Sequence, residues 1–120
     1  MHKIIIDTDF LLHALDAKVD IISELKKILD FNYEVYILDK TYEELKGKKN
    51  EKMAINFLKK GFKTYKTNMD KTVDELILDL NDEKIVVCTG DREFKEKLKK
   101  RNIPVINLRQ RKYLVIENVL

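Results

Sequence analysis

The chain is poor in several residues that mark particular protein classes. Its 120 residues include one cysteine, one proline, three glycines and no tryptophan. A single cysteine excludes an intrachain disulfide framework and a metal site built from several thiolates. Few glycines and prolines beside 44% hydrophobic residues exclude collagen-like and low-complexity disordered chains. The composition is typical of a folded globular protein.

Long hydrophobic runs are also missing. No apolar stretch approaches the roughly 20 residues that cross a membrane, and the opening residues become charged too early for a signal peptide. We therefore expect no membrane segment and a cytoplasmic location. The length suits one compact core, so residues 1–120 are predicted to form a single domain.

Positive charge gathers toward one end of the chain. Residues 1–90 carry 15 basic and 17 acidic side chains, whereas residues 91–120 carry nine basic and four acidic ones. A basic segment of this kind is suited to phosphate groups, although a solvated helix face explains its first part equally well. The residues that we expect to contact a polyanionic ligand are Arg92, Arg109, Arg111 and Lys112.

Apolar runs and amphipathic stretches alternate along the chain. Short β-branched runs predict strands at residues 3–6, 34–38, 62–66, 85–88 and 104–108, with a further edge strand at 113–116. Three- and four-residue hydrophobic spacing predicts intervening helices, among them one over about residues 18–30. Two possible capping boxes, Thr41 with Glu44 and Thr72 with Glu75, are predicted to open two of the others.

This alternation predicts an α/β fold. Strands that are separated by single helices imply right-handed crossovers and parallel pairing. The expected architecture is a three-layer sandwich, in which helices flank a central, mostly parallel sheet of about five strands.

Acidic residues stand where the predicted parallel strands end. Asp7 and Asp9 follow the first strand, and Asp91 follows the fourth. Glu44 lies in the helix after the second strand, and Asp74 lies in the first turn of the helix before the fourth. Because open parallel sheets bind ligands beyond the carboxyl ends of their strands, folding can bring these acids to one edge.

Gathered carboxylates repel one another unless a cation binds among them. An oxygen-only ligand set suits Mg²⁺ or Mn²⁺, and such an ion can promote the attack of water on a phosphodiester. Glu44, Asp74 and Asp91 also have a structural interpretation, as carboxylates that stabilise helix N-termini. Asp7 is hardest to explain in that way, because a charge that ends a buried strand is costly.

Four motifs, in this order, resemble the PIN-domain nucleases. They are IIIDTDFLL at residues 4–12, EL at 44–45, VDELI at 73–77 and VCTGDREF at 87–94. That family combines a parallel sheet and flanking helices with three or four acids that bind Mg²⁺ or Mn²⁺. The resemblance implies that Asp7, Glu44, Asp74 and Asp91 are catalytic, and that Asp7, Asp74 and Asp91 bind the metal.

Four further residues are accessory candidates by the same resemblance. Thr89 precedes Asp91 in the family's Thr-x-Asp motif. Asp9 stands where the family more often has Asn or Ser, and Glu43 is an alternative second acid. Glu75 replaces an Asp that is often paired with the third acid. Each is a candidate for a role beside the four principal acids.

The activity implied by the resemblance is that of a metal-dependent endoribonuclease. Water attacks the phosphodiester and leaves a 5′-phosphate and a 3′-hydroxyl. Residues 103–111 are similar to the branch that contains rRNA-processing nucleases, and the toxin of a toxin–antitoxin pair is a second expected role. The expected partners are RNA, a ribosomal precursor particle or an antitoxin protein, and a second copy in a homodimer.

Two other interpretations compete with this one. A haloacid-dehalogenase-type phosphatase also has a strand that ends in Asp-x-Asp, here Asp7 and Asp9, although Phe10 and Lys95 depart from its pattern. A non-catalytic PIN-like module would instead hold RNA or a protein through its basic end.

Overall fold

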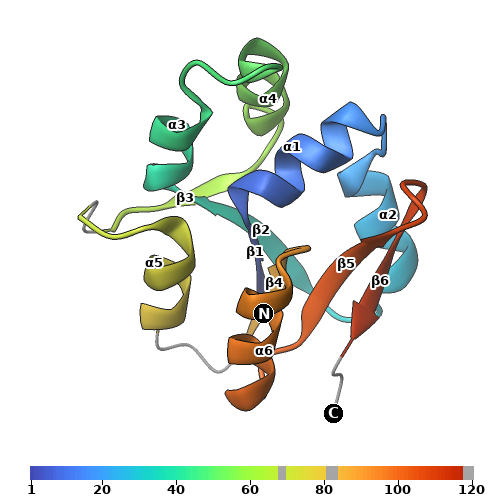
Figure 1. The fold of residues 1–120 in the computed structure, drawn as a ribbon. Helices are drawn as coiled ribbons and strands as arrows, with labels where there is room; N and C mark the ends of the chain where they lie inside the picture. The colour runs from blue at the N-terminus through green and yellow to red at the C-terminus, as the bar shows by residue number, and fades with distance from the viewer. Residues whose placement is uncertain (68–69, 81–83, 118–120) are drawn as a thin grey trace.

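Six strands form one sheet in the computed structural model, which describes residues 1–67, 70–80 and 84–117. The strands are β1 (His2–Ile6), β2 (Tyr33–Leu38), β3 (Lys63–Tyr65), β4 (Ile85–Cys88), β5 (Val105–Arg109) and β6 (Tyr113–Glu117). Their order is β3-β2-β1-β4-β5-β6 (Figure 1). Pairing is parallel from β3 to β5, and β6 runs antiparallel to β5 at one edge.

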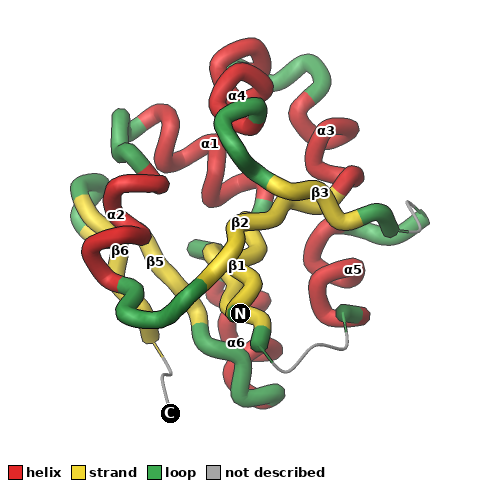
Figure 2. The backbone as a smooth tube through the Cα atoms, turned by 180° about the vertical axis from the view of Figure 1, so that it is seen from behind, coloured by secondary structure: helices red, strands yellow, loops and turns green. Residues whose placement is uncertain are grey.

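Helices cover both faces of this sheet, as the front and back views show (Figure 2). They are α1 (Thr8–Asp16), α2 (Ile21–Ile28), α3 (Asp39–Leu45), α4 (Glu51–Leu58), α5 (Val73–Asp79) and α6 (Arg92–Lys100). Buried residues of α1 to α4 pack in one hydrophobic cluster, and those of α5 and α6 pack in another. The predicted α/β sandwich with a mostly parallel sheet is therefore confirmed.

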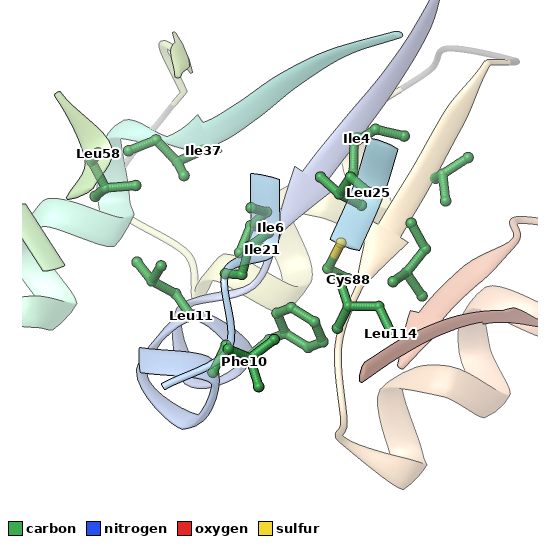
Figure 3. Close-up of a cluster of buried hydrophobic side chains, with 14 of the residues drawn as sticks. Ile4, Ile6, Phe10, Leu11, Ile21, Leu25, Ile37, Leu58, Cys88 and Leu114 are labelled. Atoms are coloured by element: carbon green, nitrogen blue, oxygen red, sulfur yellow. The ribbon is translucent and has the colours of Figure 1, made fainter. Parts of the chain in front are cut away.

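Alternation along the central strands explains the two clusters. Ile4 and Ile6 of β1 point toward α1 and α2, whereas Ile5 points toward α5 and α6. Cys88 is fully buried in the first cluster, close to Phe10 and Leu114 (Figure 3). With both faces covered, β1 and β4 can be apolar along most of their length, as fully buried parallel strands are.

The helices depart from the predictions in three places. Helix α1 was not predicted, although Phe10, Leu11 and Ala14 lie at helical spacing. Helix α2 begins at Ile21, later than the predicted 18, because Asp20 accepts a hydrogen bond from Ser23 N at 3.1 Å and caps it. The third departure is at α3, which begins before Thr41.

The Thr41–Glu44 capping box is wrong. Helix α3 already begins at Asp39, with Leu38 as its N-cap, so Thr41 lies inside the helix and Glu44 lies in its last turn. By contrast, the Thr72–Glu75 capping box is confirmed, with both reciprocal hydrogen bonds present. The predicted edge strand near residue 113 is confirmed as β6. Within the described ranges, no helix is long and apolar enough to cross a membrane.

Candidate active site

The carboxyl ends of β1 and β4 carry two neighbouring polar residues. Asp7 follows β1 and is only 6% exposed, and Thr89 follows β4 and is fully buried. The Thr89 hydroxyl donates a hydrogen bond to Asp7 Oδ2 at 2.9 Å. The backbone N–H of Asp91 donates to the same Thr89 oxygen at 3.2 Å. Thr89 therefore connects two of the predicted site residues at this edge of the sheet.

Asp7 lies in an environment that disfavours its charge. Burial, followed by the negative charge of Asp74, raises the pKa of Asp7 from 3.8 to about 7. The Thr89 hydrogen bond opposes this shift, whereas the charges of Asp9 and Glu44 add to it. A carboxylate surrounded in this way is most stable when a cation or a proton neutralises it.

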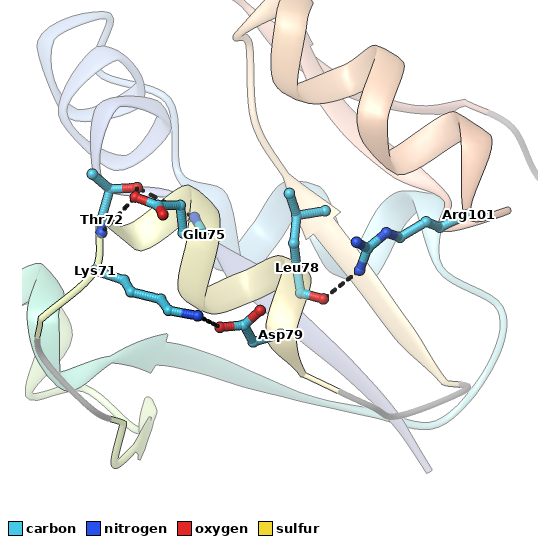
Figure 4. A network of polar contacts seen from close by, with 6 residues as sticks. All are labelled: Lys71, Thr72, Glu75, Leu78, Asp79 and Arg101. Carbon is cyan, nitrogen blue, oxygen red and sulfur yellow. Dashed lines mark hydrogen bonds and ion pairs between the residues drawn. The ribbon is translucent and has the colours of Figure 1, made fainter.

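Asp74 stands in the first turn of α5, and a polar network fixes that helix at both ends (Figure 4). Thr72 and Glu75 form the capping box at its N-terminus, and Arg101, the residue after α6, donates to the carbonyl of Leu78 near its C-terminus. Burial raises the pKa of Asp74, and the charges of Asp91, Glu44 and Asp9 raise it further. Asp74 is thus held close to the other acids.

Glu44 reaches the same region from α3. It is half-buried, and its charge raises the pKa of both Asp7 and Asp74. The helix that carries it is tied to α1 by a buried hydrogen bond of 3.3 Å from the hydroxyl of Thr8 to that of Thr41. Thr41 was predicted to cap the helix, but in the structure its hydroxyl connects α3 to α1 instead.

Asp91 is both the N-cap of α6 and a neighbour of the acids. Its Oδ1 accepts hydrogen bonds from the backbone N–H groups of Glu93 at 2.9 Å and Phe94 at 3.2 Å. Both bonds use the same oxygen, so Oδ2 is available to a ligand. The charge of Asp91 also raises the pKa of Asp74. Asp91 therefore caps α6 and also lies close to the other acids.

The chemistry of these side chains fits a hard divalent cation. Five carboxylates influence one another, and no sulfur or imidazole is among them: Asp9 of α1, Glu44 of α3, Asp74 of α5, and the residues that precede α1 and α6, Asp7 and Asp91. In the described parts of the chain, no three His, Cys, Asp or Glu side chains already converge on one point as metal ligands. The donors have the right chemistry, and their final placement around an ion requires side-chain movement.

The accessory candidates differ in their surroundings. Asp9 is exposed, but its charge reaches Asp7 and Asp74. Glu43 is exposed and pairs with Lys46 at 3.2 Å, whereas the charge of its neighbour Glu44 acts on Asp7 and Asp74. Glu75 serves in the capping box of α5.

The basic candidates lie around this edge rather than in it. Arg92 is exposed at the start of α6, and Lys112 is exposed after β5. Arg109 pairs with Glu117 at 3.8 Å, and Arg111 pairs with Asp16 at 3.2 Å. A cation that the sequence prediction left out of the site is Lys97, whose charge lowers the pKa of Asp74. The sequence pattern around Lys97, one helical turn after Phe94, did not indicate that it lies near Asp74.

Comparison with known proteins identifies the family. A family model described as a PIN like domain matches residues 4–111. The chain belongs to the PIN-domain family. Ribonuclease VapC4 from Methanocaldococcus jannaschii is 38% identical over 130 residues, which cover 97% of this chain and 97% of that protein. The predicted resemblance to PIN-domain ribonucleases is therefore confirmed.

A solved structure supports the fold independently. The structure of the PIN domain endonuclease Utp24 superposes with a TM-score of 0.86 and covers 98% of this chain and 92% of that one. Its sequence is 23% identical, so the likeness concerns the fold alone. The PIN-domain assignment is evidence against the haloacid-dehalogenase-type phosphatase, to which the sequence was similar at the Asp-x-Asp ending of the first strand and at Gly90-Asp91.

Proposed function

We propose that this PIN domain is a metal-dependent endoribonuclease that hydrolyses RNA phosphodiester bonds at the edge formed by Asp7, Glu44, Asp74 and Asp91. The observation that carries the proposal is the environment of Asp7. Its carboxylate is buried among other carboxylates that raise its pKa to about 7, so a cation would relieve the repulsion. A relative with 38% identity is named a ribonuclease, which supports RNA as the substrate.

In this proposal Asp7, Asp74 and Asp91 would hold the ion through their carboxylate oxygens. When bound, a cation such as Mg²⁺ or Mn²⁺ lowers the pKa of water and offsets negative charge on the phosphate. Thr89 orients Asp7 through the 2.9 Å hydrogen bond to Oδ2, which leaves Oδ1 for the ligand. Glu44, half-buried and next to Asp7 and Asp74, orients the attacking water.

The proposed reaction has defined products. Oxygen from water bonds to phosphorus, and the bond between phosphorus and the 3′ oxygen breaks. The departing oxygen takes up a proton and becomes a 3′-hydroxyl, and the phosphate stays on the 5′ side of the downstream fragment. Asp9, Glu43 and Glu75 are proposed as accessory residues at most, and Asp9 is the only one of them whose charge reaches Asp7.

Two biological roles are compatible with this activity. One is maturation of ribosomal RNA within a precursor particle, and the other is the toxin of a toxin–antitoxin pair, with a small antitoxin covering the acidic edge. We propose RNA as the substrate in both cases, and a homodimer as the assembly. Sequencing the cleavage sites produced in total RNA separates these roles, because precursor processing predicts a few sites at rRNA ends.

Cleavage of a labelled structured RNA tests the proposed function. The protein is incubated with Mn²⁺, Mg²⁺ or EDTA, and a generic phosphatase substrate is assayed in parallel. The proposal predicts metal-dependent cutting with 5′-phosphate and 3′-hydroxyl ends, and no release of phosphate from the phosphatase substrate. RNA binding without cutting under any of these conditions would instead support a non-catalytic module.

A further inference from the structure

Two basic segments that lie far apart in the sequence meet at the C-terminal end of α1. Asp16, the last residue of α1, accepts from Arg111 Nη2 at 3.2 Å and lies 3.9 Å from Lys49 Nζ. Lys49 belongs to the α3–α4 connection, and Arg111 belongs to the β5–β6 turn (Figure 1). Lys48 and Lys112, next to them in sequence, are exposed as well. One carboxylate therefore stands among several exposed cations.

We propose that the α3–α4 connection and the β5–β6 turn together form a platform for the RNA phosphate backbone, and that Asp16 occupies the anion position in the free protein. This inference rests on the proposed function, since it names the surface that holds the substrate beside the acids. Helix α1 begins after Asp7 and ends at Asp16, so the platform lies about 14 Å from Asp7 along the helix. A strand of RNA that enters the acidic edge can continue over α1 to these cations.

The α3–α4 connection holds its lysines in a defined position. Lys48 N–H donates to Leu45 O at 3.1 Å, Glu51 N–H donates to Lys48 O at 3.2 Å, and Gly47 N–H donates to Glu51 Oε1 at 3.1 Å. Lys49 stands within this closed connection, and its side chain is 86% exposed. Because the backbone of this connection is already ordered, binding of a phosphate does not have to order the loop as well.

The β5–β6 turn places two residues that are not glycine in the left-handed region of backbone conformation. Three residues, 110–112, connect the paired Arg109 and Tyr113. The φ angle is 55° at Gln110 and 53° at Arg111, and positive φ is also found at the two central positions of a type I′ turn. Glycine or asparagine is the usual choice at such positions, because a side chain with a β-carbon is strained there. Backbone strain of this kind is frequent at ligand-binding sites, and Arg111 combines it with an exposed charge beside Asp16.

Asp16 is also poorly placed for the stability of its own helix. A carboxylate in the last turn of α1 faces the negative end of the helix dipole. The ion pairs with Lys49 and Arg111 offset this effect, but exposed pairs of this kind contribute little stability. A phosphate can replace Asp16 against both cations without exposing a hydrophobic surface.

Binding of a fluorescent single-stranded RNA in EDTA tests the platform without cleavage. The double variant Lys48→Ala/Lys49→Ala is expected to weaken binding by on the order of tenfold and to reduce the salt slope by about 1.4, for two lost contacts. Its control is Lys26→Ala/Lys63→Ala, which removes the same charge from a shallow groove between α2 and β3. Equal weakening in both double variants would overturn the platform, because net charge alone would then explain the loss.

A pair of glycine substitutions separates ligand binding from folding. Arg111→Gly and Gln110→Gly each relieve one positive-φ residue, so both are expected to raise the melting temperature by a few degrees. Only Arg111→Gly is expected to weaken RNA binding. If the two variants bind RNA equally, Arg111 does not contact the phosphate and the platform is overturned.

The exchange of Asp16 for phosphate has its own test. Asp16→Asn is expected to strengthen RNA binding several-fold, because both cations lose a competing anion. The control is Asp79→Asn, which removes the last acid of α5 and its pair with Lys71 at 2.7 Å. Equal affinities of the two variants would overturn the role of Asp16. These binding measurements contain no metal, so they are independent of the cleavage assay. If the wild type cleaves RNA but the platform variants bind RNA as well as their controls do, the platform is refuted and the nuclease proposal is kept.

Discussion

Thr89 and Asp7 are 82 positions apart in sequence and are joined by a 2.9 Å hydrogen bond between the ends of two adjacent strands. The bond is buried, and the same Thr89 oxygen accepts from Asp91 N–H. One hydroxyl therefore fixes the orientation of the first predicted acid and the position of the last.

The metal-free protein is expected to lose stability as the pH rises. The pKa of Asp7 is about 7 in the folded protein and near 3.8 when exposed, so the unfolded chain releases this proton first. The contribution of neutral Asp7 to the free energy of unfolding is fully present below about pH 4. It is lost as the pH rises through 7, and the loss is up to about 4 kcal/mol. The raised pKa of Asp74 acts in the same direction. Urea unfolding in EDTA at pH 5 and pH 8 measures the difference.

The Asp7→Asn protein should lack most of this pH dependence. Asparagine cannot ionise, and its side-chain oxygen can still accept from the Thr89 hydroxyl, so the fold is expected to be kept. At pH 8 without metal, this variant is expected to be more stable than the wild type. An equal change in the free energy of unfolding of both proteins between pH 5 and pH 8 would contradict the assigned environment of Asp7.

Thr89→Val is expected to weaken metal binding by roughly tenfold. It removes the hydrogen bond that lowers the pKa of Asp7, so a larger fraction of Asp7 is protonated at neutral pH. The metal-dependent rate should therefore reach its plateau at a higher pH than in the wild type. Thr89→Ser keeps the hydroxyl and should restore the wild-type pH profile. A Thr89→Ser profile that resembles that of Thr89→Val would contradict this account, because a retained hydroxyl would then fail to restore the wild-type behaviour.

Glu44 and its neighbour Glu43 offer a matched comparison. Glu44→Gln is expected to reduce cleavage roughly tenfold or more, because its carboxylate faces Asp7 and Asp74. Glu43→Gln should leave cleavage within about twofold, since Glu43 is exposed and pairs with Lys46. Both rates are measured at saturating Mn²⁺. A larger loss of cleavage in Glu43→Gln than in Glu44→Gln would make Glu43 the second acid, which is the alternative that the sequence left open.

Sequence pattern predicted the sheet well because its signal is local. Residues 85–88 form an apolar β-branched run bounded by polar residues, and β4 has those same bounds. Helix α1 escaped prediction because its first residues, Thr8 and Asp9, are typical of a loop after a strand. Phe10 and Leu11 pack in one hydrophobic cluster with Ile4 and Ile6 of β1, and this packing stabilises the helix.

Helix boundaries and the surroundings of the acids depend on contacts that a linear pattern does not contain. Thr41 and Glu44 have the spacing of a capping box, yet Thr41 is buried against Thr8 and the helix begins earlier. Lys97 approaches Asp74 because α5 and α6 pack on the same face of the sheet. The sequence could indicate which acids to consider, while their mutual electrostatics required the fold.

The most direct test of the central claim is the cleavage of a 5′-labelled RNA in Mn²⁺ by the wild type, Asp7→Asn and Asp79→Asn. The first variant removes the buried carboxylate at the end of β1, and the second removes an exposed carboxylate of α5 away from the acids. The proposed site predicts that Asp7→Asn loses cleavage while it remains folded, and that Asp79→Asn cleaves like the wild type. Undiminished cleavage by pure, folded Asp7→Asn would contradict the proposal that this acidic edge is the catalytic centre.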